Sequence, residues 1–509
     1  MARKIHVVLS LMLGLAVACG TQLEEADDRL PIGVFQEAPC PVAIPEGWTE
    51  GKEITCGYVI VPERHSEPDG PTLKLAIAKI SSINESPDPD PIVPLPTGPG
   101  SSAFDSFLDF MASPVGAEFL KTREAVIFEQ RGLLYSEPNL VCAESHAYFM
   151  DRQSQNWSGQ KSVEKTVEAF EACKQSLQDR GVNLDAFKYV ESAADLIMVM
   201  DTLGYDKFNA LGISAGTMLS QRLLRDHADR LRSVTINSVA PLDQPLHADF
   251  PAFSARSLQH LFEACSADPS CNQAYPDLGV KLERTVKRLN ENPVTVEIDD
   301  PRSGGKSQVI INGDRFAEVV FVSGYSNYSV PRVPELITLV DSGDEQKLSE
   351  LAQRMAGPGD QFAWGLGYSV FCSDSLEVTE ERITFDGLFP AYEEAVANLV
   401  WGPRTLIGIC DMWGVERLSP TISTLPVSDV PTLVMSGEFD SITPPEAAAR
   451  VAAKLTHAYE YTIPGAAHSA IESGPCPFSI ALQFLEDPSK EPDASCISDL
   501  AIQFHVPGN

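Results

Sequence analysis

Short apolar runs alternate with stretches of helical periodicity along the first half of the chain. Helical spacing is found at 192–203 and 215–227. Apolar runs of strand length lie at 92–95, 125–128, 208–211 and 233–239. Because strands that alternate with helices form right-handed crossovers, we expect a mostly parallel sheet with helices on both faces. Two earlier runs, 56–61 and 72–80, flank a Pro-Asp-Gly-Pro turn and predict a hairpin.

The pattern changes after residue 240. Residues 241–405 are mostly helical in period, with one hairpin predicted near Val294–Ile311. Strand-like runs return at 431–435 and 459–463. A helical block inside an otherwise alternating sequence predicts a cap inserted over the sheet. We therefore divide the folded part into an α/β core made of 39–240 and 406–509, and a helical cap made of 241–405.

The amino terminus has the features of a secretory signal over residues 1–18: a basic start, an apolar run and small residues at its end. Ala16-Val17-Ala18 suits an ordinary signal peptidase. The stretch 15–20, Leu-Ala-Val-Ala-Cys-Gly, resembles a bacterial lipobox in which Cys19 is the lipid attachment site. We favour the lipobox, with 19–38 as a tether. No later segment is long and apolar enough to span a bilayer, so we expect an exported protein, either a cell-envelope lipoprotein or a secreted one.

The cysteine count supports export. Of eleven cysteines, ten remain when Cys19 is set aside, and an even number in an exported protein predicts disulfides. Connectivity does not follow from spacing alone. We expect sequence neighbours to pair, because each pair then closes a short loop. The predicted pairs are Cys40–Cys56, Cys142–Cys173, Cys265–Cys271, Cys372–Cys410 and Cys476–Cys496.

The chain of 509 residues is strongly acidic, with 38 basic against 71 acidic residues and a net charge of −33. Nucleic acid is therefore an unfavourable partner, because binding phosphates requires clustered Lys and Arg. The acidity is spread along the chain, and one interpretation is that it serves solubility alone. The alternative is that the negative charge attracts cations, including the amino termini of peptides.

The chain contains one GxSxG motif, Gly212-Ile213-Ser214-Ala215-Gly216, which is the first candidate catalytic feature. A predicted strand precedes Ser214 and a predicted helix follows it. In that context the glycines permit a tight turn that raises the serine hydroxyl above the sheet edge, over a helix amino terminus. Ser214 is therefore the candidate nucleophile; the alternative is a glycine-rich turn with an idle serine.

A serine hydroxyl needs a base, and the base needs an acid, in the chain order Ser, acid, His. His468 follows the run 459–463 and lies among small residues, in the expected place for the base. Asp440 follows the run 431–435 and a glycine turn, which suits the acid; Glu438 is its rival. We interpret the Thr443-Pro-Pro-Glu stretch as a helix start, with Thr443 as the N-cap residue.

The developing oxyanion needs two backbone N–H donors. One is expected from Ala215, directly after the nucleophile. The other is expected from the turn Gly98-Pro99-Gly100 after an early strand. Because Pro99 has no N–H, we choose Gly98; a plain turn is the alternative.

At these residues the sequence resembles the exported tripeptidyl aminopeptidases of the α/β-hydrolase superfamily, relatives of proline iminopeptidase. The resemblance runs from about Cys56 to Cys496. Its landmarks are 56–62 Cys-Gly-Tyr-Val-Ile-Val-Pro, 98–100 Gly-Pro-Gly, 130–132 Gln-Arg-Gly, 212–217, 372–374 Cys-Ser-Asp, 410–413 Cys-Asp-Met-Trp and 440–444. The chain departs from the family pattern at Thr97, Glu129 and Ala215, where the family usually has Gly, Asp and an aromatic residue.

The resemblance implies an α/β-hydrolase fold and a serine peptidase that releases short peptides from free amino termini, with a peptide as partner and no metal or cofactor. A cap carboxylate would bind the substrate ammonium. Asp374, Glu377, Glu380 and Glu381 are candidates, and none is assigned. Two alternatives stay open: a carboxylesterase or lipase-like enzyme on the same triad, and a non-catalytic protein that keeps the fold. The physiological peptide and the oligomeric state are left open.

Overall fold

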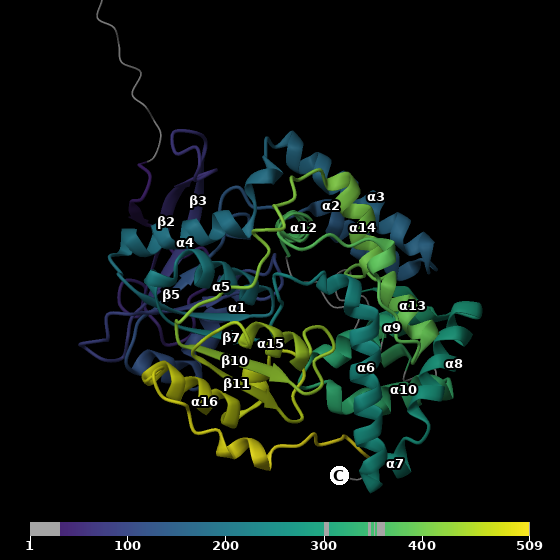
Figure 1. Ribbon diagram of the computed structural model, residues 1–509. Helices are drawn as coiled ribbons and strands as arrows, with labels where there is room; N and C mark the ends of the chain where they lie inside the picture. The colour runs from purple at the N-terminus through teal and green to yellow at the C-terminus, as the bar shows by residue number, and fades with distance from the viewer. Residues whose placement is uncertain (1–30, 300–304, 345–347, 351, 354–361, 508–509) are drawn as a thin grey trace, which may run out of the picture. The chain divides into compact units, whose positions relative to one another are not determined.

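A large sheet of nine strands forms the centre of the described part of the chain (Figure 1). The computed structural model describes residues 31–299, 305–344, 348–350, 352–353 and 362–507. The described residues from Ile32 onward form one compact unit. In spatial order the strands are β1 (Phe35–Glu37), β2 (Ile54–Pro62), β3 (Thr72–Ile80), β5 (Ala125–Phe128), β4 (Ile92–Leu95), β6 (Phe208–Ile213), β7 (Leu231–Asn237), β10 (Thr432–Gly437) and β11 (Ala458–Ile463).

The sheet is antiparallel at one end and parallel through the rest. β1, β2, β3 and β5 pair antiparallel, and every neighbouring pair from β5 to β11 is parallel. β4 and β5 are buried along their whole length, as parallel strands covered on both faces are. The parallel strands bring their carboxyl ends to one edge of the sheet, where the loops after β4, β6, β7, β10 and β11 meet.

Helices cover both faces of the sheet, as the alternating pattern predicted. One face packs against α4 (Tyr189–Leu203), α5 (Ala215–Asp226) and α15 (Pro445–Ala452). The opposite face packs against α1 (Ala103–Ala112) and α16 (Pro475–Glu486). Alternate residues of each strand enter the two cores, because successive side chains point to opposite faces.

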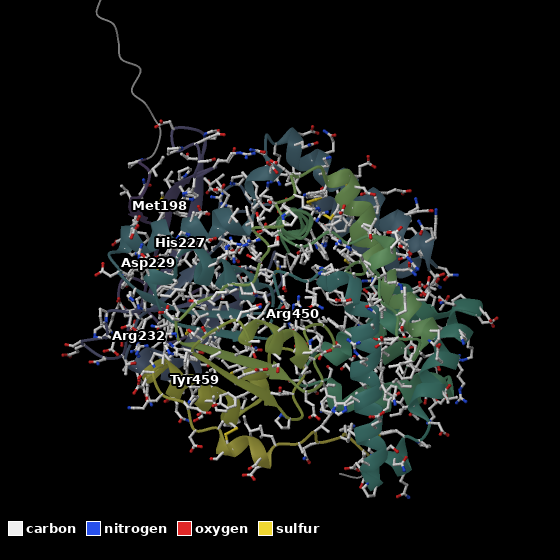
Figure 2. All side chains as sticks on the ribbon, viewed as in Figure 1. Met198, His227, Asp229, Arg232, Arg450 and Tyr459 are labelled. Carbon is white, nitrogen blue, oxygen red and sulfur yellow. A yellow bond between two sulfur atoms is a disulfide. The ribbon has the colours of Figure 1, made fainter. Side chains whose placement is uncertain are left out.

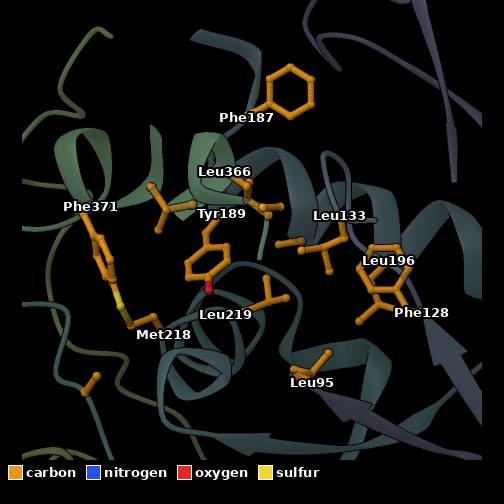
Figure 3. Close-up of a cluster of buried hydrophobic side chains, with 14 of the residues drawn as sticks. Leu95, Phe128, Leu133, Phe187, Tyr189, Leu196, Met218, Leu219, Leu366 and Phe371 are labelled. Carbon is orange, nitrogen blue, oxygen red and sulfur yellow. The ribbon is translucent and has the colours of Figure 1, made fainter. Parts of the chain in front are cut away.

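The core on the α4 and α5 side extends outward into a further layer of helices. Figure 3 shows Leu95 of β4 and Phe128 of β5 in the same cluster as Leu196 of α4, Leu219 of α5 and Leu366 of α12. This outer layer contains α2 (Ala143–Asp151), α3 (Gln160–Asp179), α12 (Trp364–Ser373) and α14 (Pro403–Trp413). The helices that cover the core on this side therefore come from two separate stretches of chain, 143–179 and 364–413.

Most of the remaining helices form a lobe with its own hydrophobic core, which we call the helical lobe. It consists of α6 (Leu246–Ala267), α7 (Pro269–Ala274), α8 (Leu278–Glu291), α9 (Gly313–Tyr325), α10 (Val333–Ser342), α13 (Pro390–Ala397) and the antiparallel hairpin of β8 (Val294–Asp299) and β9 (Lys306–Ile311). Its centre includes Leu282, Phe316 and Tyr392. The hairpin lies where the sequence predicted it.

Five disulfides and a surface ion pair connect segments of the described part of the chain. The structure contains the disulfides Cys40–Cys56, Cys142–Cys173, Cys265–Cys271, Cys372–Cys410 and Cys476–Cys496, the same pairs that the sequence predicted. Arg450, labelled in Figure 2, extends from α15 and forms a bidentate ion pair with Asp243, at 2.9 and 2.8 Å.

One predicted boundary needs correction. Residues 35–37, which we placed in the tether 19–38, form strand β1 and pair with Gly57–Val59 of β2. A three-residue edge strand is too short to produce a recognisable alternation, so its sequence does not distinguish it from a linker. The predicted signal segment 1–18 and Cys19 lie outside the described residues. The boundaries drawn at 240 and 405 stay predictions.

Candidate active site

Ser214 lies at the turn from β6 into α5, in a backbone conformation that few residues adopt. Its φ is +56° and its ψ −121°, and its side chain is almost buried. A Cβ at Gly212 would lie 2.3 Å from the Ser220 hydroxyl, and one at Gly216 would lie 2.5 Å from the Leu95 carbonyl. Both positions therefore require glycine, because the turn packs too closely against α5 and the loop after β4.

The turn is held at its backbone. The Ser214 N–H donates to the Asn237 carbonyl at 3.0 Å, which ties it to the end of β7. The Thr217 hydroxyl donates to the Ser214 carbonyl at 2.6 Å. The amino terminus of α5 lies directly behind the serine, so the helix dipole favours negative charge there. These contacts fix the hydroxyl at the carboxyl edge of the sheet.

Asp440 lies in the loop after β10, with both carboxylate oxygens engaged. Oδ1 accepts from the backbone N–H groups of Ile442 and Thr443, at 3.0 and 2.9 Å. Oδ2 lies 2.8 Å from Nδ1 of His468. Burial raises the pKa of Asp440, whereas the charge of His468 and these hydrogen bonds lower it. The lowering effects are larger together, so the pKa of Asp440 lies below its ordinary value. The carboxyl is therefore ionised at neutral pH.

His468 lies in the loop after β11, and its two ring nitrogens have different surroundings. The Asp440 carboxylate can only accept, so Nδ1 carries the proton and Nε2 presents a lone pair. Nε2 is buried and has no hydrogen-bond partner among the described residues. An imidazole held in this tautomer can take a proton from a hydroxyl and then be stabilised as a cation by the aspartate.

Thr443 joins this pair and corrects one expectation. Its hydroxyl donates to Asp440 Oδ2 at 2.8 Å and lies 3.1 Å from His468 Nδ1. It does not cap α15, which begins at Pro445 with Pro444 in the N-cap position. The N–H and the hydroxyl of Thr443 both donate to the Asp440 carboxylate, so neither group takes part in a cap of α15. The sequence signal for a cap, Thr followed three residues later by Glu, is present in either case.

The end of β7 connects the loops of Ser214 and His468. Asn237, whose carbonyl binds the Ser214 N–H, also accepts from the Ile471 N–H through its side chain, at 3.2 Å. The Ser238 hydroxyl accepts from the Ser469 N–H at 2.9 Å. The serine and histidine loops are thus bound to adjacent residues of one strand end. Sequence reasoning missed both, because neither residue belongs to a motif.

The predicted oxyanion donors lie on adjacent loops. β4 and β6 are neighbours, with Leu95 in register with Gly212. The turn after β4 therefore follows directly beside the serine turn, and Gly98 adopts a φ of +43° within it. In the described part of the chain, the N–H groups of Gly98 and Ala215 donate no hydrogen bond. Both are available to a developing negative charge.

Three other predicted candidates form contacts elsewhere. Glu438, the rival acid, accepts from the Gly465 N–H and lies 2.8 Å from the ring of His260. Asp374, a candidate for the substrate ammonium, is fully buried, accepts from the Tyr189 N–H and forms an ion pair with Arg222 at 3.4 Å. It has no free face for a ligand. Glu380 forms an ion pair with Arg404 at 2.9 Å.

One further carboxylate, Glu472, interacts electrostatically with His468 and Tyr325. Glu472 lies on the 3₁₀ turn Ala470–Ser473, directly after the histidine loop. Desolvation raises its pKa, and the charge of His468 opposes that rise. Its own charge also raises the pKa of Tyr325, after the larger effects of burial and of Asp440.

Within the described residues, no group of three or more His, Cys, Asp and Glu side chains could hold a metal ion.

A mostly parallel sheet that carries a serine at a strand-to-helix turn, with an aspartate and a histidine after two later strands, is the arrangement of an α/β hydrolase. The family model for the alpha/beta hydrolase fold matches residues 90–475, and the chain belongs to this family. In the described part, none of the helices has the length and apolarity needed to cross a membrane.

Known proteins with similar sequences indicate which kind of α/β hydrolase this chain resembles. The chain is 25% identical to serine protease Hip1 of Mycobacterium tuberculosis over 488 residues, which cover 92% of this chain and 91% of that protein. It is 28% identical to the tripeptidyl aminopeptidase of Streptomyces lividans over 200 residues, 38% of this chain and 36% of that one. A solved proline iminopeptidase from Mycobacterium smegmatis aligns with a TM-score of 0.40 and 13% identity, covering 85% and 98% of the two chains. The two sequence relatives support a peptidase-type α/β hydrolase.

Proposed function

We propose that this protein is an exported serine aminopeptidase that releases tripeptides or similar short peptides from free amino termini. One observation carries the proposal: the buried Asp440–His468 hydrogen bond of 2.8 Å leaves Nε2 of His468 without a partner, in a loop that is bound to the same strand end as the loop of Ser214. The names of the sequence relatives, a serine protease and a tripeptidyl aminopeptidase, favour an amide over an ester substrate.

In the proposed reaction, His468 Nε2 removes the proton of the Ser214 hydroxyl as its oxygen attacks the scissile carbonyl. Asp440 stabilises the resulting imidazolium, with Thr443 holding the same carboxylate oxygen. His468 then protonates the leaving amine, which departs as the carboxyl-terminal part of the peptide. Water, activated by the same imidazole, frees the short amino-terminal piece from Ser214.

The N–H groups of Gly98 and Ala215 are proposed to bind the oxyanion of each tetrahedral intermediate. Backbone donors in this position are already oriented and need no rearrangement as charge develops. Removal of one oxyanion donor in other enzymes costs about 10²–10³ in rate. The unpaired state of both N–H groups supports their assignment, because a paired N–H would have to give up a partner first.

The free amino terminus of the substrate requires a carboxylate within the site. Asp374 is unsuitable, because it is buried and paired with Arg222. Of the carboxylates described above, Glu472 acts electrostatically on both His468 and Tyr325 and forms no ion pair with a cationic side chain in the described residues. We therefore consider Glu472 a better candidate for attracting a cationic peptide end than the cap carboxylates suggested by sequence.

A substrate comparison tests the function. The same tripeptide anilide is offered with a free and with an acetylated amino terminus, alongside a short-chain aryl ester. We expect cleavage of the free anilide and none of the acetylated one. Cleavage of the ester with neither anilide would instead identify the carboxylesterase alternative.

Two variants complete this test. Ser214→Ala should lower the rate by at least about 10³-fold, because nothing replaces the nucleophile. Ser479→Ala, at an exposed serine on α16, should leave the rate unchanged. Full activity in Ser214→Ala would exclude the proposed site, and equal rates for the free and acetylated anilides would exclude an aminopeptidase.

We also propose that the mature protein is exported and anchored through a lipid on Cys19. Five disulfides within the described chain support an oxidising compartment. Metabolic labelling with radioactive palmitate in a bacterial host should label the wild type and not Cys19→Ala. Release of unlabelled wild-type protein into the medium would favour ordinary signal peptidase cleavage instead.

A further inference from the structure

A segment of the helical lobe is bound directly to the loop that carries His468. This segment, 326–330, follows the end of α9 and contains Asn327. The side-chain oxygen of Asn327 accepts from the Ala467 N–H at 2.7 Å. Its side-chain nitrogen donates to the carbonyls of His468 and Ser469, at 3.0 and 3.1 Å. One carboxamide from the lobe thus binds three consecutive residues of the histidine loop.

Asn327 is itself held in place within the lobe. The Ser326 carbonyl accepts from the N–H groups of Ser329 and Val330, at 3.0 and 2.8 Å, which closes a turn around Asn327. Val330 is buried in the hydrophobic core of the lobe. The carboxamide therefore extends from a fixed turn, and its three hydrogen bonds hold the histidine loop against the lobe.

Ser469, directly after His468, has a left-handed backbone conformation, with a φ of 61° and a ψ of 52°. For a residue with a side chain, this conformation is about 5- to 30-fold less populated than the right-handed one. Such a conformation persists only where surrounding contacts hold it. Two side chains bind Ser469: the Ser238 hydroxyl accepts from its N–H at 2.9 Å, and Asn327 donates to its carbonyl. One contact comes from the end of β7 and the other from the lobe.

The backbone at Ser469 helps to determine where the imidazole of His468 lies. The imidazole is bound by Asp440 at 2.8 Å and is stacked on the ring of Tyr325, with centroids 4.2 Å apart. Another conformation at Ser469 would rotate the peptide group that follows His468 and shift the ring relative to both contacts. Nε2 must reach the Ser214 hydroxyl to take its proton, and a misplacement of about 1 Å can cost about 10²-fold in rate.

We propose that Asn327 is a positioning residue that holds Ser469 in its left-handed conformation and thereby places the imidazole of His468. This inference rests on the proposed function. The histidine loop is then held from two parts of the fold, by Ser238 at the sheet edge and by Asn327 from the lobe. Loss of Asn327 should slow the chemical step, because the base would spend less time in the productive position.

Asn327→Leu tests the proposal, since leucine is similar in size and forms none of the three hydrogen bonds. Its matched control is Asn290→Leu on α8, which removes an amide that forms two hydrogen bonds with Asp314 inside the lobe, at 3.2 and 2.9 Å. The probe is diisopropyl fluorophosphate, which is small enough to need little of the peptide site. Ser214 Oγ forms a bond to phosphorus, the P–F bond breaks, fluoride leaves and the serine proton passes to His468. Mass spectrometry counts the labelled sites, so the rate constant per labelled site does not depend on the fraction of folded protein.

We expect Asn327→Leu to lower the labelling rate constant per site and kcat on the peptide anilide by a similar factor, about 10- to 100-fold, with KM within about threefold. Asn290→Leu should stay within about twofold of wild type in each measurement. Adding Ser469→Gly to Asn327→Leu should raise the labelling rate at least about threefold, because glycine adopts the left-handed conformation without strain. A purely structural role of Asn327 would reduce the number of labelled sites and leave the rate constant per site unchanged.

The proposal is overturned if Asn327→Leu labels at the wild-type rate per site, or if Ser469→Gly restores none of the lost rate. It is also overturned if KM rises while kcat stays unchanged, since Asn327 would then act on substrate binding. Failure of the underlying function gives a different result. If mass spectrometry finds no probe on Ser214 of the wild type, the proposed enzyme is wrong. If Ser214 is labelled and Asn327→Leu shows no change, only the role of Asn327 is wrong.

Discussion

The Thr443 hydroxyl donates a hydrogen bond of 2.8 Å to the Asp440 oxygen that also binds His468. Asp440 is thereby held by four donors: two backbone N–H groups, one hydroxyl and one imidazole. A carboxylate so completely satisfied has one orientation, and the imidazole bonded to it has one orientation as well. The orientation of the His468 imidazole is therefore set by Asp440, which Thr443 holds in turn.

Replacement of Thr443 tests this arrangement. Thr443→Val keeps the shape and removes the donor, so Asp440 loses a charge-assisted hydrogen bond of about 1.5–3 kcal/mol. We expect kcat/KM to fall roughly 10-fold or more. Thr443→Ser, which keeps the hydroxyl, should recover most of the activity. Wild-type activity in the valine variant would mean that the hydroxyl does not help to position the pair.

Asp440 and Glu438 differ by two positions, and their variants should differ sharply. Asp440→Asn presents an amide to His468 and favours the wrong imidazole tautomer, a change that costs about 10⁴ in kcat in enzymes with a Ser-His-Asp triad. Glu438→Gln should stay within a few-fold of wild type, because Glu438 contacts His260 and Gly465 instead. Steady-state kinetics on the peptide anilide distinguish the two. The assignment of the acid would be reversed if Glu438→Gln were the inactive variant.

Glu129 should make stability depend on pH. Its carboxylate is fully buried and accepts from the Ala103 N–H at 2.6 Å, at the start of α1. Burial raises the pKa of Glu129 from 4.5 to about 7, against the lowering effect of its hydrogen bonds. The native state therefore binds more protons than the unfolded chain between these values. This group's contribution to stability falls as pH rises through that window, by up to about 3 kcal/mol.

Glu129→Gln cannot ionise, so it should gain stability relative to wild type between pH 5 and pH 8. Urea unfolding at several pH values measures the difference. Glu118→Gln, at a carboxylate on the 3₁₀ turn Gly116–Lys121 whose side chain is 40% exposed, is the matched control and should show no such trend. A stability difference for Glu129→Gln that does not change with pH would contradict the buried, proton-binding carboxyl.

The disulfides should contribute to stability in order of loop length. Cys372–Cys410 joins α12 to α14 across 38 residues, whereas Cys265–Cys271 spans 6. Loop-closure entropy gives losses of about 4 and about 2 kcal/mol when each pair is replaced by serines. Urea unfolding of the two double variants should show the larger loss for the pair at 372 and 410. The opposite order would show that contacts and not loop entropy dominate.

Much of the sheet follows from local sequence. β3, β4 and β5 begin and end at the residues predicted, because each is a run of apolar or alternating residues bounded by turn residues. The hairpin of β8 and β9 was also anticipated from its alternation. β1 was missed, because an edge strand of three residues gains its structure from β2 and not from its own pattern.

Packing between segments that are distant in the chain could not be predicted from the sequence. The sequence assigned 143–179 to the core, and nothing in it indicates that α3 packs against α14 beyond residue 400. The amphipathic stripe of a helix shows that a face is buried, but does not identify its partner. The same limit applies to Arg222 and Asp374, which are both buried and form an ion pair across 152 positions.

The sequence by itself determined the candidate serine, aspartate and histidine, because a strand-to-helix turn, a late acid and a later histidine leave local signals of glycine spacing and strand order. Only the tertiary structure decided that the Thr443 hydroxyl donates a hydrogen bond to Asp440 and that the ring of Tyr325 stacks on His468. Those contacts depend on how the helical lobe packs against loops far away in the chain. A single residue in such a contact carries no periodic or spacing signal, so its role becomes visible only when the chain is folded.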